Sequence, residues 1–431
     1  MIALVAALLL AAGPGSGDEP ADDRAALHFQ ATIATQAHPP FAAAYSGRNS
    51  MLPDAESATS IVTDIFAGVR LWRGAEFYFQ PELSGGTGLS YTLGIAAFPS
   101  GEVYRVGNPR PAVLPARLFL RQTLGLGGGK IHLDDGPNQL AGTRDRDALT
   151  VTVGKLATTD FVDNVPYSND PHTHFLSWGL FASGAYDYPA DTRGYTWGAA
   201  ADLSIDWWSL RGGIFLEPQY ANLLPMEWDI GKARALVAEF EGRFKIGGRP
   251  GAARVLGFVN DARMGSYQQA LTDPRFGLDV TATRAFGRTK EGFAASANLE
   301  LADGLGAFAR VSYNDGATET WAFTEIDRSA AAGATQSGSR WGRADDEAGL
   351  ALVVSGLSDV HRRYLAAGGY GFIIGDGALH YGPELLAELY YRAAITREVS
   401  LSAHYQPVVN PAFNRDRGPI HVFTGLLHVA F

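Results

Sequence analysis

Charged side chains of both signs alternate with apolar residues along three neighbouring segments in the first third of the chain. On each segment the polar residues share one parity: they are Asp64, Arg70 and Trp72, then Glu76 and Glu82, then Arg117 and Arg121 within residues 115–124. A guanidinium is a rigid hydrogen-bond donor and a carboxylate is an acceptor, so rows of both can bind the hydroxyl groups of a polar solute. Facing charges of opposite sign cancel, which favours an uncharged solute over an ion.

Two longer segments without a clear alternation carry further charges. They are residues 84–113, with Glu102 and Arg105, and residues 157–175, with Asp160 and Asp163. If the three polar rows line the inside of a closed sheet, connecting segments of this length can fold inward and narrow it. We therefore add these four residues to the candidate binding set.

The elements that carry these residues are predicted to be β-strands, because apolar and polar residues alternate with a period of two. In residues 75–83, Phe77 and Phe79 alternate with Glu76 and Gln80. The same pattern recurs in residues 27–36, 195–206, 293–301, 385–395 and 399–407. Such alternation indicates strands with one apolar face and one polar face. A soluble β-sandwich would alternate in the same way and is the alternative fold.

Both ends of the chain favour a barrel in a bacterial outer membrane. Residues 423–431 alternate and end on the aromatic Phe431, as expected of a last strand whose outer face meets lipid. Residues 2–12 form an unbroken apolar run that is shorter than the roughly 20 residues of a spanning helix. We interpret residues 1–17 as a cleaved secretory signal and residues 18–431 as a single barrel domain. A buried N-terminal helix is the alternative, since no lysine or arginine precedes the run.

Composition agrees with this class of fold. Charged residues make up 19% of the chain, and it contains 51 glycines, which suit turns and bends between strands. The mean hydropathy of -0.04 requires apolar and polar residues to be interleaved rather than separated into blocks. The chain has no cysteine, which excludes disulfides and thiolate metal sites. Its net charge of -10 argues against a nucleic-acid partner.

The sequence thus predicts an all-β fold, a transmembrane antiparallel β-barrel whose long outer loops fold into the lumen. The chain length suggests 16 strands, with 18 as an alternative. Aromatic residues near strand ends are expected to form interfacial girdles; these are Tyr186, Tyr188, Tyr195, Trp197 and Trp208.

Several stretches resemble the carbohydrate-selective porin family, the OprB-type porins of Gram-negative bacteria. They are QAHPPFAAAYSGRNSM (36–51), GVRLWRGAEFYFQPE (68–82), GLSYTLGIAAFPSGE (88–102), YSNDPHTHFLSWGLFASGAYDYPADTRGYTWG (167–198), ARMGSY (262–267), YNDGATETWAFTEIDRS (313–329) and NRDRGPIHVF (414–423). The resemblance implies a 16-stranded outer-membrane barrel, a pore narrowed by inward-folded loops, and passive diffusion of small neutral sugars. His172 and His174 depart from it, because an arginine and a glutamine are expected there.

The remaining partners follow from this class of protein. The outer wall is expected to contact outer-membrane lipid, and the strand that ends at Phe431 to be recognised by the barrel-assembly machinery. Relatives of this type make both a monomer and a trimer plausible. No cofactor is expected.

Three other interpretations of the sequence have less support. A barrel with a hydrolase activity or an adhesin with a blocked lumen is the alternative function, although no serine, histidine and aspartate arrangement supports the enzyme. His172 and His174 are spaced to share a metal but lack an evident third ligand. The acidic pairs at Asp134 and Asp345 lack the spaced oxygen ligands of a calcium loop, so no metal site is predicted.

Overall fold

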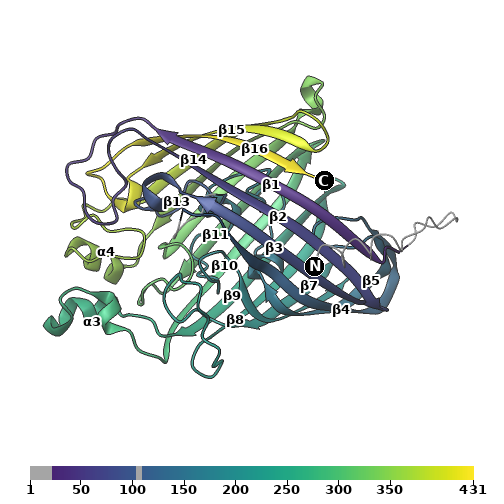
Figure 1. Ribbon diagram of the computed structural model, residues 1–431, viewed down its shortest axis with the longest axis horizontal. Coiled ribbons are helices and arrows are strands. Elements are labelled where there is room, and N and C mark those ends of the chain that lie inside the picture. The colour runs from purple at the N-terminus through teal and green to yellow at the C-terminus, as the bar shows by residue number, and fades with distance from the viewer. Residues whose placement is uncertain (1–21, 103–108) are drawn as a thin grey trace.

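The chain folds into a closed antiparallel β-barrel (Figure 1). The computed structural model describes residues 22–102 and 109–431, and within these residues sixteen strands pair in chain order, with β1 also pairing with β16. The predicted sixteen strands are therefore confirmed. The proposed signal at residues 1–17 and the candidate Arg105 lie outside the described residues.

The strands are β1 (Ala25–His38), β2 (Glu56–Trp72), β3 (Ala75–Gly86), β4 (Ala112–Leu133), β5 (Gly142–Leu156), β6 (Thr196–Ile205), β7 (Trp208–Phe215), β8 (Arg234–Ile246), β9 (Arg249–Ala262), β10 (Arg288–Ala302), β11 (Leu305–Asn314), β12 (Arg328–Ser337), β13 (Glu347–Gly356), β14 (Glu384–Ala394), β15 (Val399–Val409) and β16 (Ile420–Ala430). The helices are short: α2 (Trp178–Phe181), α3 (Tyr267–Thr272) and α4 (Asp359–Ala366). Single 3₁₀ turns occur at Leu89–Thr92, Thr158–Asp160, Pro274–Phe276, Val280–Thr283, Gly338–Trp341 and Pro411–Phe413. None of the helices in the described part of the chain has the length and apolar character of a membrane-spanning segment.

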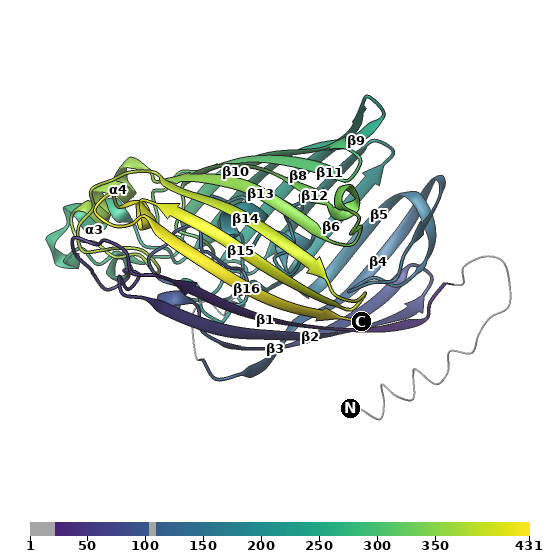
Figure 2. The ribbon, with the colours of Figure 1, turned by 90° about the horizontal axis from the view of Figure 1, so that it is seen from above.

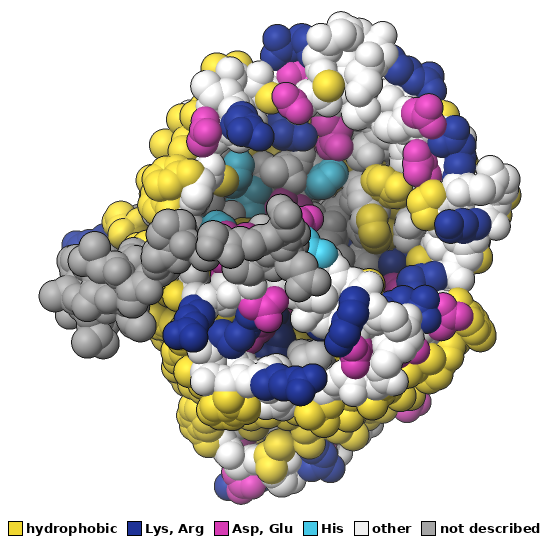
Figure 3. All heavy atoms as spheres, turned by 90° about the vertical axis from the view of Figure 1, so that its right-hand side faces the viewer, with side chains coloured by type: hydrophobic (Ala, Val, Ile, Leu, Met, Phe, Trp, Pro, Cys, Tyr) yellow, Lys and Arg dark blue, Asp and Glu magenta, His cyan; other side chains and the backbone are white. Residues whose placement is uncertain are grey.

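Successive residues of each strand alternate between the lumen and the outer wall. On β14, Leu389 is 53% exposed whereas its neighbour Glu388 is fully buried, and on β10, Phe293 is exposed whereas Ser296 is buried. Large apolar side chains thus cover the outside, and polar ones fill the inside (Figure 3). This is the reverse of a soluble β-sandwich and is the arrangement of a barrel in lipid.

The two ends of the barrel differ in the length of their connections. At one end, called here the turn end, tight turns such as Arg73 and Gly74 join neighbouring strands. Gly74 has φ +76°, and a Cβ there would lie 2.2 Å from the carbonyl oxygen of Thr123, so the turn requires glycine. At the other end, the loop end, longer connections carry α3 and α4 (Figures 1 and 2).

The barrel closes between its first and last strands. The N–H of Phe29 donates a hydrogen bond to the carbonyl of Phe431 at 2.7 Å, and the N–H of Phe431 donates to the carbonyl of Phe29 at 3.0 Å. The two rings lie 5.0 Å apart. The terminal aromatic residue therefore completes the seam.

Two connections of the loop end fold into the lumen: one through residues 87–102 and the other through residues 157–195. Carboxylates on β14 hold them there, since Glu384 accepts hydrogen bonds from two backbone N–H groups of the first loop at 2.7 and 2.9 Å. Glu388 accepts two from the second loop at 2.7 and 3.0 Å. The expected inward folding of outer loops is thus confirmed, and buried strand carboxylates are its physical cause.

One sequence-based expectation about aromatic residues is wrong. Tyr186 and Tyr188 do not lie at a lipid interface but are buried inside the barrel, where Tyr188 packs against Phe323 with ring centroids 4.1 Å apart. Tyr195 also faces inward, where its hydroxyl bonds to Glu82. These tyrosines belong to the inserted loop, or adjoin it, rather than to the outward face of a strand. Trp208, by contrast, packs beside Phe240 of the outer wall.

Candidate functional site

A cavity of about 450 Å³ lies between the inner wall of β1 to β4 and the inserted loops. This volume falls in the range of cavities that bind small molecules. Six of the eleven candidates from the sequence line it: Asp64, Glu82, Glu102, Arg117, Asp160 and Asp163. The lining also includes Gln80, Asn138, His172, Arg193 and Tyr195.

Arg117 of β4 and Asp160 of the second inserted loop form the central ion pair of the cavity. Nε and Nη2 of Arg117 donate to the two carboxylate oxygens of Asp160, both at 2.6 Å. Nη1 donates to Oε1 of Gln80 at 2.7 Å, and the guanidinium carbon lies 5.2 Å from the ring centre of Tyr195. A bidentate pair of this kind fixes both groups in position, so the loop meets the wall here.

Glu82 of β3 binds the end of the same loop. Its Oε1 accepts a hydrogen bond from Nη1 of Arg193 at 3.1 Å, and its Oε2 accepts one from the hydroxyl of Tyr195 at 2.7 Å. These two contacts orient the phenol ring beside the guanidinium of Arg117. The result is an aromatic face next to a fixed donor, which are the two features that a sugar ring needs from a binding wall.

Asp64 of β2 connects the strands on either side of it. Its carboxylate accepts hydrogen bonds from the amides of Gln30 on β1 at 2.9 Å and Gln80 on β3 at 2.8 Å. Because Gln80 also accepts a hydrogen bond from Arg117, its side-chain amide connects Asp64 with Arg117.

Glu102 holds His172, one of the two histidines that depart from the family pattern. Oε2 of Glu102 lies 2.9 Å from Nδ1 of His172, and the imidazole stacks on His428 of β16 at 5.4 Å. Burial lowers the pKa of His172, but the charge and contact of Glu102, followed by the charges of Asp170 and Asp64, outweigh it and raise the pKa to about 10. His172 therefore acts as a cation that ties the two inserted loops together.

This raised pKa predicts how the pore responds to alkali. The contribution of protonated His172 to loop stability is fully present below its ordinary pKa of about 6.5 and is lost as the pH rises through about 10. Single-channel recordings between pH 7 and 11 should therefore show steady current up to about pH 9 and increased current noise above pH 10. The His172→Gln variant should show no rise in current noise above pH 10. If the same rise occurs in that variant, another group causes it.

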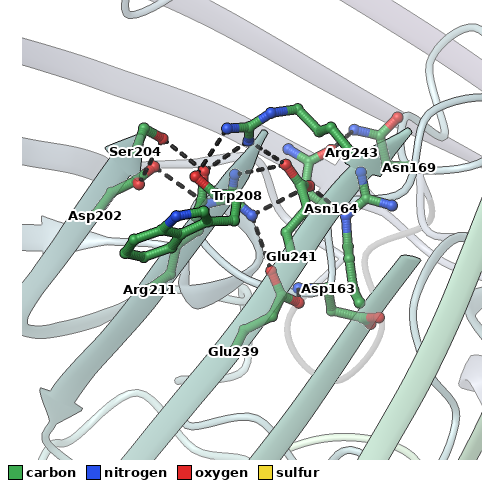
Figure 4. Close-up of polar contacts among 12 residues, drawn as sticks. Asp163, Asn164, Asn169, Asp202, Ser204, Trp208, Arg211, Glu239, Glu241 and Arg243 are labelled. Carbon is green, nitrogen blue, oxygen red and sulfur yellow. Dashed lines mark hydrogen bonds and ion pairs between the residues drawn. The ribbon is translucent and has the colours of Figure 1, made fainter. Parts of the chain in front are cut away.

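Asp163 is buried and fastens the second loop to the far wall of the barrel. Its carboxylate pairs with Arg310 of β11 at 2.5 Å and accepts from the backbone and hydroxyl of Ser183 at 2.6 and 2.7 Å. Its own N–H donates to Glu239 of β8 at 2.7 Å (Figure 4). Asp163 thus borders the cavity but acts as an anchor, because its carboxylate oxygens are already hydrogen-bonded.

The far wall carries a second charged network that the sequence did not reveal. Arg211 of β7 bonds to Asp202, Glu239 and Glu241 at 3.1 to 3.3 Å (Figure 4). Glu241 also accepts from Arg243 at 2.7 Å and pairs with Arg254 at 2.7 Å. Arginine and carboxylate side chains therefore face the lumen from both sides.

Three further candidates, Arg70, Glu76 and Arg121, do not line the cavity. The two arginines bind the turn at residues 134–141 instead. Arg121 of β4 donates to the carbonyl of Asn138 at 3.0 Å, and Arg70 of β2 donates to that of Ala141 at 3.1 Å. Glu76 lies between these arginines, 3.4 Å from Arg70 and 4.0 Å from Arg121. They are part of the inner wall, as expected, but residues 134–141 cover them.

Trp72 is a correction to the predicted inward row. The pairing of β2 with β3 shifts between Arg70 and Trp72, so Arg70 faces Glu76 whereas Trp72 faces Ala75. This bulge reverses the parity at the end of the strand. Trp72 is consequently 58% exposed on the face opposite the lumen, where its indole N–H donates to Gln122 at 3.0 Å.

The described residues contain no group of three or more histidine, cysteine, aspartate or glutamate side chains that is placed to bind a metal. His172 and His174 diverge, since His174 lies 3.6 Å from Glu347 while His172 contacts Glu102. The acidic pairs are engaged elsewhere, because Asp135 contacts a histidine of β1 and Asp346 pairs with an arginine of its own turn.

Sequence reasoning missed Gln80, Asn138, Arg193 and Tyr195 of the lining. Gln80 shares the inward parity of Glu76 and Glu82, so the pattern already contained that signal. Arg193 and Tyr195 carried no such signal, because their position depends on how the loop enters the lumen.

Comparison with known proteins agrees with this geometry. The family model of carbohydrate-selective porins, OprB family, matches residues 50–431. A search of curated proteins finds no match. Among solved structures, the chain is similar to Pseudomonas putida OprB at high pH, with a TM-score of 0.70, 16% identity, and coverage of 95% of this chain and 94% of that one. The low-pH form of that protein gives a TM-score of 0.52, 14% identity, and coverage of 95% and 93%.

The outer-membrane channel DcaP of Acinetobacter baumannii is a more distant neighbour, with a TM-score of 0.52, 10% identity, and coverage of 94% of this chain and 97% of that one. At these identities the structural likeness supports the fold, and the family match supports the membership. The fold and the family are those of a channel in the outer membrane rather than of an enzyme. The chain belongs to the OprB family of carbohydrate-selective porins.

Proposed function

We propose that small neutral sugars diffuse passively into the cell through the cavity between β1 to β4 and the inserted loops. The observation that carries this proposal is the arrangement around Arg117, where a fixed donor, the partly exposed carboxylate of Asp160 and the ring of Tyr195 lie together on one side of the cavity. A sugar hydroxyl both donates and accepts, so such a wall can replace part of the hydration shell of the solute at each step.

The charges of this wall favour uncharged solutes with a secondary preference for cations. Each arginine of the described lining is paired with a carboxylate: Arg117 with Asp160, and Arg193 with Glu82. Carboxylates nevertheless outnumber the cationic side chains there. The cavity is lined by Arg117, Arg193 and His172, against the carboxylates of Asp64, Glu82, Glu102, Asp160, Asp163 and Asp170. We therefore propose a weak cation preference in ion conductance beside the passage of sugars.

Osmotic swelling of liposomes that contain the purified protein tests this function. Swelling should be fast with a pentose or hexose, slower with a disaccharide and absent with a larger oligosaccharide. Protein-free liposomes provide the control. The absence of swelling with every sugar, from a barrel that still conducts ions, would contradict the proposal.

We also propose that the last strand directs assembly through its terminal aromatic residue. Phe431 completes the seam against Phe29, and it remains 68% exposed. Deleting Phe431 should reduce the amount of folded barrel at the cell surface several-fold, because the assembly machinery and the closing strand pair both lose this residue. The Phe293→Ala variant removes an equally outward-facing aromatic residue from β10 and should assemble normally. Normal surface levels without Phe431 would remove it as an assembly signal.

A further inference from the structure

The connection between β4 and β5, residues 134–141, turns back into the lumen from the turn end. Its tip is a β-turn in which the N–H of Gln139 donates to the carbonyl of Gly136 at 3.0 Å. Pro137 and Asn138 occupy the central positions, and Asn138 has φ +57°. Proline at the second position and a residue with positive φ at the third are the features of a type II turn, so the sequence itself makes this tip rigid.

The inner wall of the barrel holds this turn in place. The hydroxyl of Tyr78 accepts a hydrogen bond from the N–H of Leu140 at 3.1 Å, and the side chain of Leu140 packs with Tyr78 and Phe119 in a buried cluster. Arg121 donates to the carbonyl of Asn138 at 3.0 Å. These polar and apolar contacts come from β3 and β4 together, so the turn is fixed on two strands.

Asn138 brings the tip to the solute cavity. Its side-chain nitrogen donates to Oε1 of Gln80 at 3.1 Å, and Oε1 of Gln80 also accepts from Arg117. Pro137 and Asn138 both line the cavity, together with Asp160 and His172 from the opposite, inserted loop. Oδ1 of Asn138 has almost no accessible surface, so the side chain shapes the cavity through the bond that holds the tip against Gln80.

We propose that residues 134–141 form the floor of the pore, and that this floor, held at its tip by Asn138, sets the size limit for sugars from the turn end. The inference rests on the proposed function for the identity of the solute. It assigns size selection to two opposed elements: the inserted loop 157–195 on one side of the cavity and the turn 134–141 on the other. The turn end of such barrels faces the periplasm, so the floor is the last constriction that an incoming sugar meets.

The first test replaces residues 134–141 by the two-residue turn Asn-Gly, which suits the paired positions Leu133 and Gly142. A matched control replaces the other long connection of the turn end, residues 338–346, in the same way between Ser337 and Glu347. The folding of both variants is checked by gel electrophoresis in detergent, where a folded barrel migrates differently before and after heating. Single-channel conductance and liposome swelling are then measured with a hexose, a disaccharide and a trisaccharide.

Shortening of the 134–141 turn should raise the conductance several-fold and admit the trisaccharide, while the control keeps the wild-type values. An unchanged conductance and size limit in the folded 134–141 variant would overturn the proposal. Conductance needs no sugar, so it tests the floor even if the wild-type protein fails to pass sugars, which would instead contradict the proposed function.

A second variant tests the role of the side chain itself. Asn138→Gly keeps the backbone conformation, since glycine adopts positive φ without strain, but it removes the amide that donates to Gln80. Loss of this bond should loosen the tip of the floor, raise the conductance and relax the size limit, while the folding of the barrel stays unchanged. A wild-type conductance and size limit in Asn138→Gly would show that the bond to Gln80 does not hold the floor.

Discussion

Replacing Arg310 by methionine is expected to open the pore and to destabilise the barrel. Arg310 is buried and binds the inserted loop at three places: the carboxylate of Asp163, the hydroxyl of Ser168 at 3.1 Å and the carbonyl of Phe181 at 2.9 Å. Removal of one partner of a buried ion pair leaves the other charge unpaired and costs about 3–5 kcal/mol. The loop then loses its attachment to β11, so conductance should rise and become noisy, and larger sugars should pass.

The Arg254→Met variant is the matched control for this prediction. Arg254 and Arg310 lie in the same row of the inner wall, because both are paired with Ser296 of β10. Arg254, however, bonds to Glu241 and Asn298 of neighbouring strands and not to the inserted loop. Its removal should lower the heat stability of the barrel without changing the size limit. If the Arg310 variant folds and keeps the wild-type conductance and size limit, the inserted loop is held by other contacts.

The Arg117→Ala variant is expected to change both ion selectivity and sugar binding. It frees the carboxylate of Asp160 and leaves Asp64, Glu82 and Glu102 nearby without this cation, so the preference for cations should increase several-fold. A hydrogen bond from a charged donor contributes about 1.5–3 kcal/mol, so the affinity for sugar should fall by about 10- to 100-fold. Reversal potentials in a salt gradient measure the first effect, and titration of the ion current with sugar measures the second.

Two companion variants separate charge from geometry at this site. Arg117→Lys keeps the charge but not the planar fork, so its ion selectivity should stay near the wild-type value while sugar affinity falls. Arg121→Ala should shift the size limit rather than the ion selectivity, because Arg121 holds the turn at Asn138. If Arg117→Ala leaves both selectivity and sugar affinity unchanged, Arg117 has no part in the constriction.

The strand pattern was sufficient to predict the barrel. Alternation with a period of two assigns each strand residue to lipid or lumen, so Asp64, Glu82 and Arg117 were placed on the inner wall from sequence alone. The same rule failed at Trp72, because a bulge shifts the parity by one and leaves no mark in the alternation.

The way the loops and turns fold could not be predicted in the same way. The sequence grouped Arg70, Glu76 and Arg121 with the lining, yet the turn at residues 134–141 covers them. Arg310 and Asp163 lie far apart in the chain, and they meet only because the barrel closes and the loop crosses its lumen. Contacts of this kind depend on closure of the whole sheet, which no local pattern records.

Block of the pore by a single attached group tests most directly whether solute passes through this cavity. The chain has no cysteine, so Asn164→Cys, in the exposed part of the cavity lining, introduces one reactive thiol. Asp303→Cys, in an exposed turn between β10 and β11, provides the control. A bulky thiol reagent should abolish most ion current and hexose uptake in the Asn164 variant and leave both intact in the Asp303 variant. Full current and uptake after complete labelling of Asn164→Cys would show that solutes take another path.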